Sequence, residues 1–166
     1  PAGDSLPPLY VLDARIELAS LSGRRVLPIA AFILDPGRSA LRKDEIITRI
    51  LLPKTPHWTR ERFTKIGRRR AMTIAVVSFA GMVRLDRQRR IAEIRMAWGS
   101  VGPTVIRLAA LEAELAGQPV EAAAVEQVRR AVLNGVAPIS DLRSSAEYRS
   151  LVAANLAVDF VEGLCG

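Results

Sequence analysis

The spacing of apolar residues changes along this chain, and this change restricts the fold more than any other feature. In the first part, as in residues 77–85, apolar side chains recur at every second position, which is the period of a half-buried strand. From Thr104 onward they recur every three or four positions, which is the period of a helix. Strands in one block and helices in another indicate an α+β fold, with antiparallel sheets and about three helices, and not a parallel sheet with alternating helices.

The opening block contains three segments with the composition of strands. The stretch 21–24 is typical of a hairpin turn between the first two, and 35–38 is rich in turn residues. We expect strands at Arg15–Ala19, Arg25–Ile29 and Glu45–Leu52.

A domain boundary is predicted at Pro53–Pro56, because two prolines flank a polar pair there. Beyond it, strands are expected at Thr59–Ile66, Ile74–Leu85 and Ala92–Trp98. The last two would form an antiparallel hairpin around the charged turn Asp86–Arg90.

Three helices are predicted after the strands. Thr104 is the expected N-cap of the first helix, and Gly117 closes it. The second helix ends at Asn134-Gly135, and Ser144 with Glu147 forms a capping box before the third.

The sequence contains few residue types that carry catalysis or bind metal. The chain has one cysteine, Cys165, and one histidine, His57. These are too few ligands for zinc, haem or iron–sulfur binding within this chain. The segment Gly99–Gly102 lacks the lysine and the glycine spacing of a phosphate-binding loop, so we interpret it as a turn between a strand and a helix. No catalytic residue and no metal ligand is predicted.

The formal net charge is +7, with basic clusters at 65–70 and 84–90. Such basic clusters could bind nucleic acid, form a solvated face, or dock an acidic partner protein. Aromatic residues are few and no nucleic-acid motif accompanies the arginines, so a nucleic-acid partner is not expected. No apolar run approaches the ~20 residues that span a bilayer, and the amino terminus has no signal-peptide pattern, so we expect a cytoplasmic protein. The first residue is not Met, which favours a processed chain or a fragment.

Six segments, in order along nearly the whole chain, resemble the carboxy-terminal portion of a known family of subunits. That family is the FAD-binding, or medium, subunits of the molybdenum hydroxylases, which include xanthine dehydrogenase and carbon monoxide dehydrogenase. The similar segments are Pro1–Leu9, Asp35–Arg38, Asp44–Ile46, Lys65–Val77, Gly99–Thr104 and Ser140–Arg149.

The resemblance implies two domains and an oxidoreductase. Residues 1–53 would end an FAD-binding domain of the PCMH type, and 57–166 would form a domain like the carboxy-terminal one of the carbon monoxide dehydrogenase flavoprotein. Electrons would pass from [2Fe-2S] clusters through FAD to an external acceptor.

The resemblance also implies partners, namely a small iron–sulfur subunit, a large subunit with the molybdenum cofactor, and an amino-terminal FAD subdomain. The family's glycine-rich pyrophosphate-binding stretches lie upstream of this region, so the isolated chain is expected to be inactive. The resemblance leaves open whether the protein forms a homo-oligomer and which substrate the enzyme uses. The alternative function is a docking or scaffold module that does not bind FAD.

Three residues match flavin-contacting positions of that family. Asp4 matches an aspartate that hydrogen-bonds the cofactor, Ile47 an apolar residue beside the flavin, and Lys65 a lysine near it. The alternatives are a turn cap for Asp4, an ordinary core residue for Ile47, and a solvated cation for Lys65. Tyr148 and Arg149 are expected to hold the third helix in place, without a catalytic role.

Overall fold

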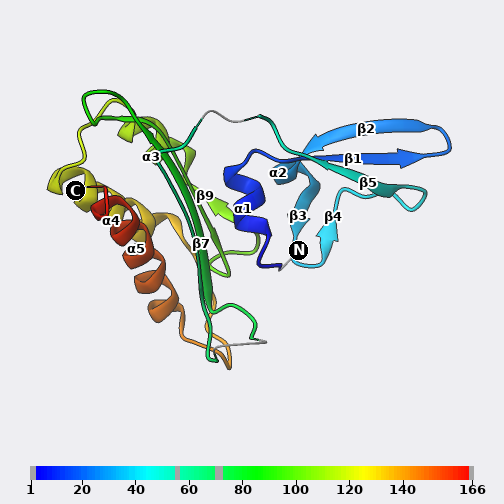
Figure 1. Cartoon of the computed structure of the whole chain (residues 1–166). Helices are drawn as coiled ribbons and strands as arrows, with labels where there is room; N and C mark the ends of the chain where they lie inside the picture. The colour runs from blue at the N-terminus through cyan, green and yellow to red at the C-terminus, as the bar shows by residue number, and fades with distance from the viewer. Residues whose placement is uncertain (1–2, 55–56, 70–72, 165–166) are drawn as a thin grey trace.

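The computed structural model describes residues 3–54, 57–69 and 73–164. Arg70, Cys165 and the 55–56 part of the predicted boundary lie outside these residues. Figure 1 shows two bodies side by side: an amino-terminal block of short strands and helices, and a longer sheet covered by helices. The sheets pair antiparallel and the helices follow the strands, so the predicted α+β fold is confirmed.

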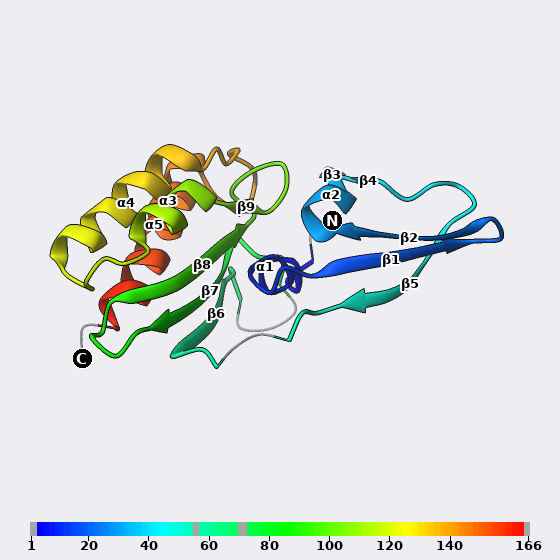
Figure 2. The ribbon, with the colours of Figure 1, turned by 90° about the horizontal axis from the view of Figure 1, so that it is seen from above.

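The amino-terminal block is built on a three-stranded sheet in the order β2-β1-β5, with a separate β3–β4 pair. This sheet projects away from the rest of the molecule (Figure 2). The three predicted strands are present, whereas neither α1 nor α2 was expected. The elements are α1 (Leu6–Val11), β1 (Arg15–Ser20), β2 (Gly23–Pro28), α2 (Ile29–Phe32), β3 (Ile33–Asp35), β4 (Arg38–Ser39) and β5 (Ile46–Leu51).

The second block is a four-stranded antiparallel sheet in the order β6-β7-β8-β9. Its three helices lie together on one face of the sheet (Figure 2). The elements are β6 (Arg60–Ile66), β7 (Val77–Leu85), β8 (Ile91–Gly99), β9 (Ile106–Arg107), α3 (Ala109–Leu115), α4 (Ala122–Gly135) and α5 (Ala146–Glu162).

Both faces of this sheet are buried, which explains why β7 is apolar at almost every position. On the helix side, the Phe79 ring lies 5.5 Å from that of Trp98 and 5.6 Å from that of Phe160. On the other side, Ala80 and Met82 pack in the same cluster as residues of α1. The small helix α1 therefore closes a second core that the amino-terminal block shares with the sheet.

The predicted start of the first helix is wrong by four residues. Helix α3 begins at Ala109 with Leu108 in the N-cap position, and not at Thr104. The intervening Ile106 pairs with Trp98 and forms β9. Pairing with a distant strand has overridden the local helical pattern here.

The cap of the last helix is shifted by one residue. Ser145, and not Ser144, is the N-cap of α5, and its side chain accepts a hydrogen bond from the Tyr148 N–H at 3.2 Å. Ser144 is used elsewhere, since its N–H donates to the backbone and side chain of Asp141. The predicted capping box with Glu147 is thus replaced by a simple serine cap.

One acidic side chain joins the two blocks. Asp13 follows α1 with a positive φ of 51°, and its carboxylate contacts Arg95 of β8 at 2.6 Å and Arg107 of β9 at 2.5 Å. Arg107 also pairs with Glu112 of α3 at 2.8 Å, and Glu112 accepts the Met96 N–H at 2.9 Å. Burial opposes the charge of Arg107, but the two carboxylates outweigh this effect and raise its pKa. We call these residues the Asp13 cluster.

A second ion pair closes the loop before β5. The Glu45 carboxylate accepts hydrogen bonds from the Arg25 side chain at 2.6 and 2.7 Å and from the Arg42 N–H at 2.8 Å. The hydrogen bond from Arg25 is the main cause that lowers the pKa of Glu45 from 4.5 to about 2. Glu45 therefore stabilises the fold only while it is ionised.

We predict that Glu45 contributes to acid unfolding. Since its folded pKa is below its unfolded value, its contribution is complete above pH 4.5 and falls as the pH drops toward 2. Glu45→Gln should be less stable at neutral pH and should flatten this part of the stability curve. Urea titrations from pH 7 to pH 2 measure both effects, with Asp44→Asn as a matched control of an exposed neighbouring carboxylate. Parallel curves for Glu45→Gln and wild type would contradict the assignment.

Candidate functional site

The structure brings together two of the three residues singled out from the sequence. The Lys65 ammonium on β6 contacts the Asp4 carboxylate at 2.5 Å, although the two residues are 61 positions apart. Asp4 lies in the turn before α1, and Lys65 is opposite Ser78 of β7. The side chain of Asp4 is 45% exposed and that of Lys65 is 27% exposed, so both are open to solvent or to a ligand.

Asp4 borders a small hollow of about 90 Å³ between α1 and the β8–β9 turn. Position 99 leaves little room for a side chain, because a Cβ there would lie 2.4 Å from the Ser78 Oγ and 3.2 Å from the Pro7 ring. This turn was predicted as a strand–helix connection, but it joins two strands instead. Most residues of this turn line the hollow, namely Gly99, Ser100, Gly102, Pro103, Thr104 and Val105.

A buried arginine holds this turn in place. Arg149 of α5 is 4% exposed and donates to the Val76 and Ser100 carbonyls at 3.0 and 3.1 Å. Its other terminal nitrogen contacts Asp141 at 2.7 Å. Hydrogen bonds from Arg143, and then from Arg149, hold the pKa of Asp141 well below its usual range. These contacts bind α5 to the sheet, whereas the side chain of its neighbour in the motif, Tyr148, is largely exposed.

Ile47 lies apart from this pair. It is on β5, in the three-stranded sheet, opposite Leu18 of β1. Its exposed fraction is 50%, and its neighbours Ile46 and Ile50 are also exposed. The interpretation of Ile47 as an ordinary core residue is therefore wrong. Its side chain is available for contact with something outside the described residues.

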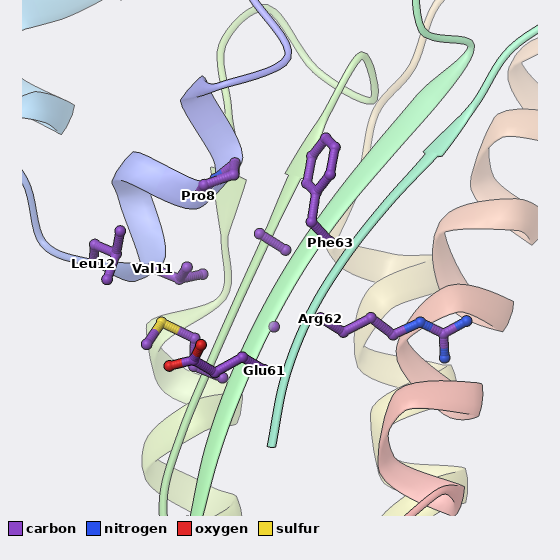
Figure 3. A pocket seen from close by; sticks show the side chains of 9 residues that line it. Pro8, Val11, Leu12, Glu61, Arg62 and Phe63 are labelled. Atoms are coloured by element: carbon purple, nitrogen blue, oxygen red, sulfur yellow. The ribbon is translucent and has the colours of Figure 1, made fainter. Parts of the chain in front are cut away.

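A groove that the sequence did not reveal runs along α1 beside β6. It encloses about 280 Å³, with Pro8, Val11 and Leu12 on the helix side. Figure 3 shows Phe63 and Glu61 on the α1 side of β6, with Arg62 pointing to the opposite side. Glu61, Phe63 and Lys65 lie at every second position of the strand and therefore on one face of it. This spacing is the sequence feature that could have revealed the groove.

Together these features place a carboxylate and an ammonium beside a small hollow. The carboxylate of Asp4 accepts hydrogen bonds, and the ammonium of Lys65 donates them and adds positive charge. The hollow is much smaller than the roughly 300–1,000 Å³ of a typical ligand pocket, so it suits only the edge of a larger molecule.

The described residues contain no group of three or more His, Cys, Asp or Glu side chains that could hold a metal ion. Among the same residues, no helix has the length and the hydropathy needed to cross a membrane.

Two family models match consecutive parts of the chain. Residues 1–55 match the FAD binding domain in molybdopterin dehydrogenase. Residues 62–164 match the CO dehydrogenase flavoprotein C-terminal domain. Asp4 belongs to the first matched region, and Lys65 belongs to the second.

Individual relatives agree with these models. The xanthine dehydrogenase FAD-binding subunit of Escherichia coli O157:H7 is 35% identical over 150 residues, which are 89% of this chain and 51% of that protein. The carbon monoxide dehydrogenase medium chain of Hydrogenophaga pseudoflava is 26% identical over 93% of this chain and 53% of its own length. A carbon monoxide dehydrogenase structure from the same organism superposes with a TM-score of 0.85 and 25% identity, covering 96% of this chain and 56% of that one. The chain thus spans about half the length of these relatives.

We predict that Gly99→Ala disturbs the site and that Gly3→Ala does not. The new methyl group at position 99 would force away both the Ser78 hydroxyl and the Pro7 ring, and overpacking of this kind costs about 1–3 kcal/mol. At Gly3 the nearest atom is 3.7 Å from the added carbon, so we expect a change within about 0.5 kcal/mol. Urea unfolding measures both free energies. Adding Ser78→Ala to Gly99→Ala should restore part of the loss, and equal stabilities of the two glycine variants would refute this packing.

Proposed function

Because the chain belongs to the CO dehydrogenase flavoprotein C-terminal domain family, we propose that it forms part of an electron-transferring, FAD-binding subunit of a molybdenum hydroxylase. Electrons would arrive from iron–sulfur clusters in a partner subunit and leave to an external acceptor. The observation that carries this proposal is the contact between Asp4 and Lys65 at 2.5 Å. It joins the two matched regions at a point that is open to a ligand.

FAD, when bound, supplies the redox chemistry, and the residues of this chain bind it and adjust its environment. The Asp4 carboxylate accepts a hydrogen bond from an N–H or O–H group of the cofactor. The Lys65 ammonium offsets the negative charge that accumulates on reduction. Ile47 offers an exposed apolar contact from the other sheet.

The dimensions of the site support a shared binding surface. A hollow of about 90 Å³ at Asp4 accommodates the polar edge of FAD and not the whole molecule. We also propose that residues 1–53 end the FAD-binding domain and that 57–166 form the adjoining domain, which the matched ranges 1–55 and 62–164 support. The remaining contacts to FAD come from an amino-terminal FAD subdomain.

The substrate is selected elsewhere in the complex. Relatives with this region are named for nicotinate, nicotine and glyceraldehyde, which share little chemistry. A segment that is common to such different enzymes serves a common step. Transfer of electrons through FAD is such a step, and it also favours this role over a docking module that does not bind FAD.

We predict that the isolated chain binds FAD weakly. Asp4 and Lys65 provide one edge of the site and Ile47 a separate contact, and few contacts give low affinity because binding must offset the loss of translational freedom. The ratio of flavin absorbance to protein after gel filtration with added FAD should be well below one. A polypeptide that also includes the preceding FAD subdomain is the control, and it should retain about one FAD. Near-stoichiometric FAD on the isolated chain would contradict the shared site.

We predict opposite effects of the two charged residues on the reduction potential of FAD in the assembled enzyme. Lys65→Ala removes a positive charge and should lower the potential, whereas Asp4→Asn removes a negative charge and should raise it. A charge in a partly buried site contributes on the order of 1–4 kcal/mol, and each kcal/mol corresponds to about 40 mV for a one-electron step.

Spectroelectrochemical titration of the complex measures these shifts. Lys43→Ala is the matched control, because Lys43 is exposed and lies in the loop before β5. Potentials and FAD content equal to wild type in both Lys65→Ala and Asp4→Asn would return the pair to a purely structural role.

A further inference from the structure

Two loops that are distant in sequence meet at one end of the four-stranded sheet. One is the β6–β7 connection, and the other lies between α4 and α5; Figure 1 shows both at the same end of β7. They are joined by a hydrogen bond from the Arg68 guanidinium to the Leu142 carbonyl at 3.0 Å. Between them is an open hollow of about 590 Å³. We call this surface the Arg143 patch; it consists of Arg68, Arg69, Thr73, Ile74, Leu142 and Arg143.

The position of the second loop is fixed by contacts that lead to a buried arginine. Arg143 contacts the Asp141 carboxylate at 2.7 and 2.9 Å, and the same carboxylate contacts the buried Arg149 at 2.7 Å. Arg149 in turn is bound to the start of β7 and to the Ser100 carbonyl. The Arg143 head is thereby held in place before any partner arrives, and Arg68 is held by its bond to the Leu142 carbonyl, which lowers the entropic cost of binding.

The patch is both basic and apolar. Leu142 is 98% exposed and Ile74 is 63% exposed, while three arginines and no carboxylate line the hollow among the described residues. Asp141 balances Arg143, but it is shared with Arg149, so the surface keeps a positive charge. Exposed aliphatic side chains surrounded by arginines are typical of a protein interface.

We propose that the Arg143 patch binds an acidic surface of another subunit of the complex, one that has an apolar side chain at its centre. Arginine forks match carboxylates in a bidentate way, and an apolar partner group would cover Leu142 and Ile74. A nucleic acid would leave these aliphatic side chains uncovered, and the patch lacks aromatic side chains for base stacking. Relatives are named as a medium chain, a medium subunit and a complex subunit, which favours a protein over a membrane. The inference rests on the proposed function only in taking the partner to be a subunit.

The test uses the complete FAD-binding subunit, co-expressed with its partner subunits. Leu142→Asp places a carboxylate in the patch at a side chain that contributes nothing to the core, and Arg143→Gln removes one charge. Leu21→Asp is the matched control, since Leu21 is equally exposed but lies in the β1–β2 turn. Native mass spectrometry over a dilution series gives the apparent Kd, and flavin absorbance gives the FAD content of each sample.

We expect Leu142→Asp to weaken assembly by about tenfold or more, and Arg143→Gln to weaken it less and to reduce its salt dependence. Leu21→Asp should assemble as wild type does. The proposal would be overturned if Leu142→Asp assembled as tightly as wild type. It would also be overturned if Leu142→Asp and Leu21→Asp weakened assembly equally. Binding to phosphatidylglycerol vesicles that Leu142→Asp abolishes, without a change in assembly, would assign the patch to a membrane instead. If no sample contained FAD, the proposed function would be refuted. The apparent Kd values would still test whether the Arg143 patch binds another subunit.

Discussion

The contact of Asp13 with Arg95 and Arg107 ties the end of α1 to the larger sheet, and with the shared core beneath α1 it joins the two blocks of this protein. Asp13 ends the α1 segment, and its two partners come from neighbouring strands of the larger sheet. Charge-assisted hydrogen bonds in a partly buried place are strong and directional, and loss of one partner would leave the others uncompensated. Because α1 is a single short helix, holding its end limits where its start can lie, and Asp4 before that start contacts Lys65.

Small residues on the α1 side of the sheet make this arrangement possible. Ala80 and Ala97 lie beneath the helix in the shared core, and the missing side chain of Gly99 makes room for the Pro7 ring. Larger residues at these positions would push α1 outward and separate Asp4 from Lys65. The site is therefore a consequence of packing, and its two charged residues would not meet through their mutual attraction alone, since exposed ion pairs contribute little.

The sequence predicted what local patterns determine. The six longer strands and the helices α4 and α5 follow from the period of the apolar residues, whereas the short strands β3, β4 and β9 were not predicted. It did not predict α1, or the pairing of Ile106 with Trp98, because both depend on distant strands. The contact between Asp4 and Lys65 spans 61 positions, so no local pattern could reveal it; the family resemblance supplied both residues, each as a separate match.

The position of Ile47 leaves one face of the three-stranded sheet incompletely covered. Leu18 is fully buried, and its cross-strand partner Ile47 is half exposed. Partners on neighbouring antiparallel strands point to the same face of a sheet, so the described residues cover this face over β1 and leave it open over β5. An apolar face that is half covered is unfavourable in water, and a contact with an additional protein segment or with the cofactor would complete it. The hollow at Asp4 is likewise too small for a whole ligand of ordinary size, so both openings fit the proposal that FAD is bound jointly with other parts of the subunit.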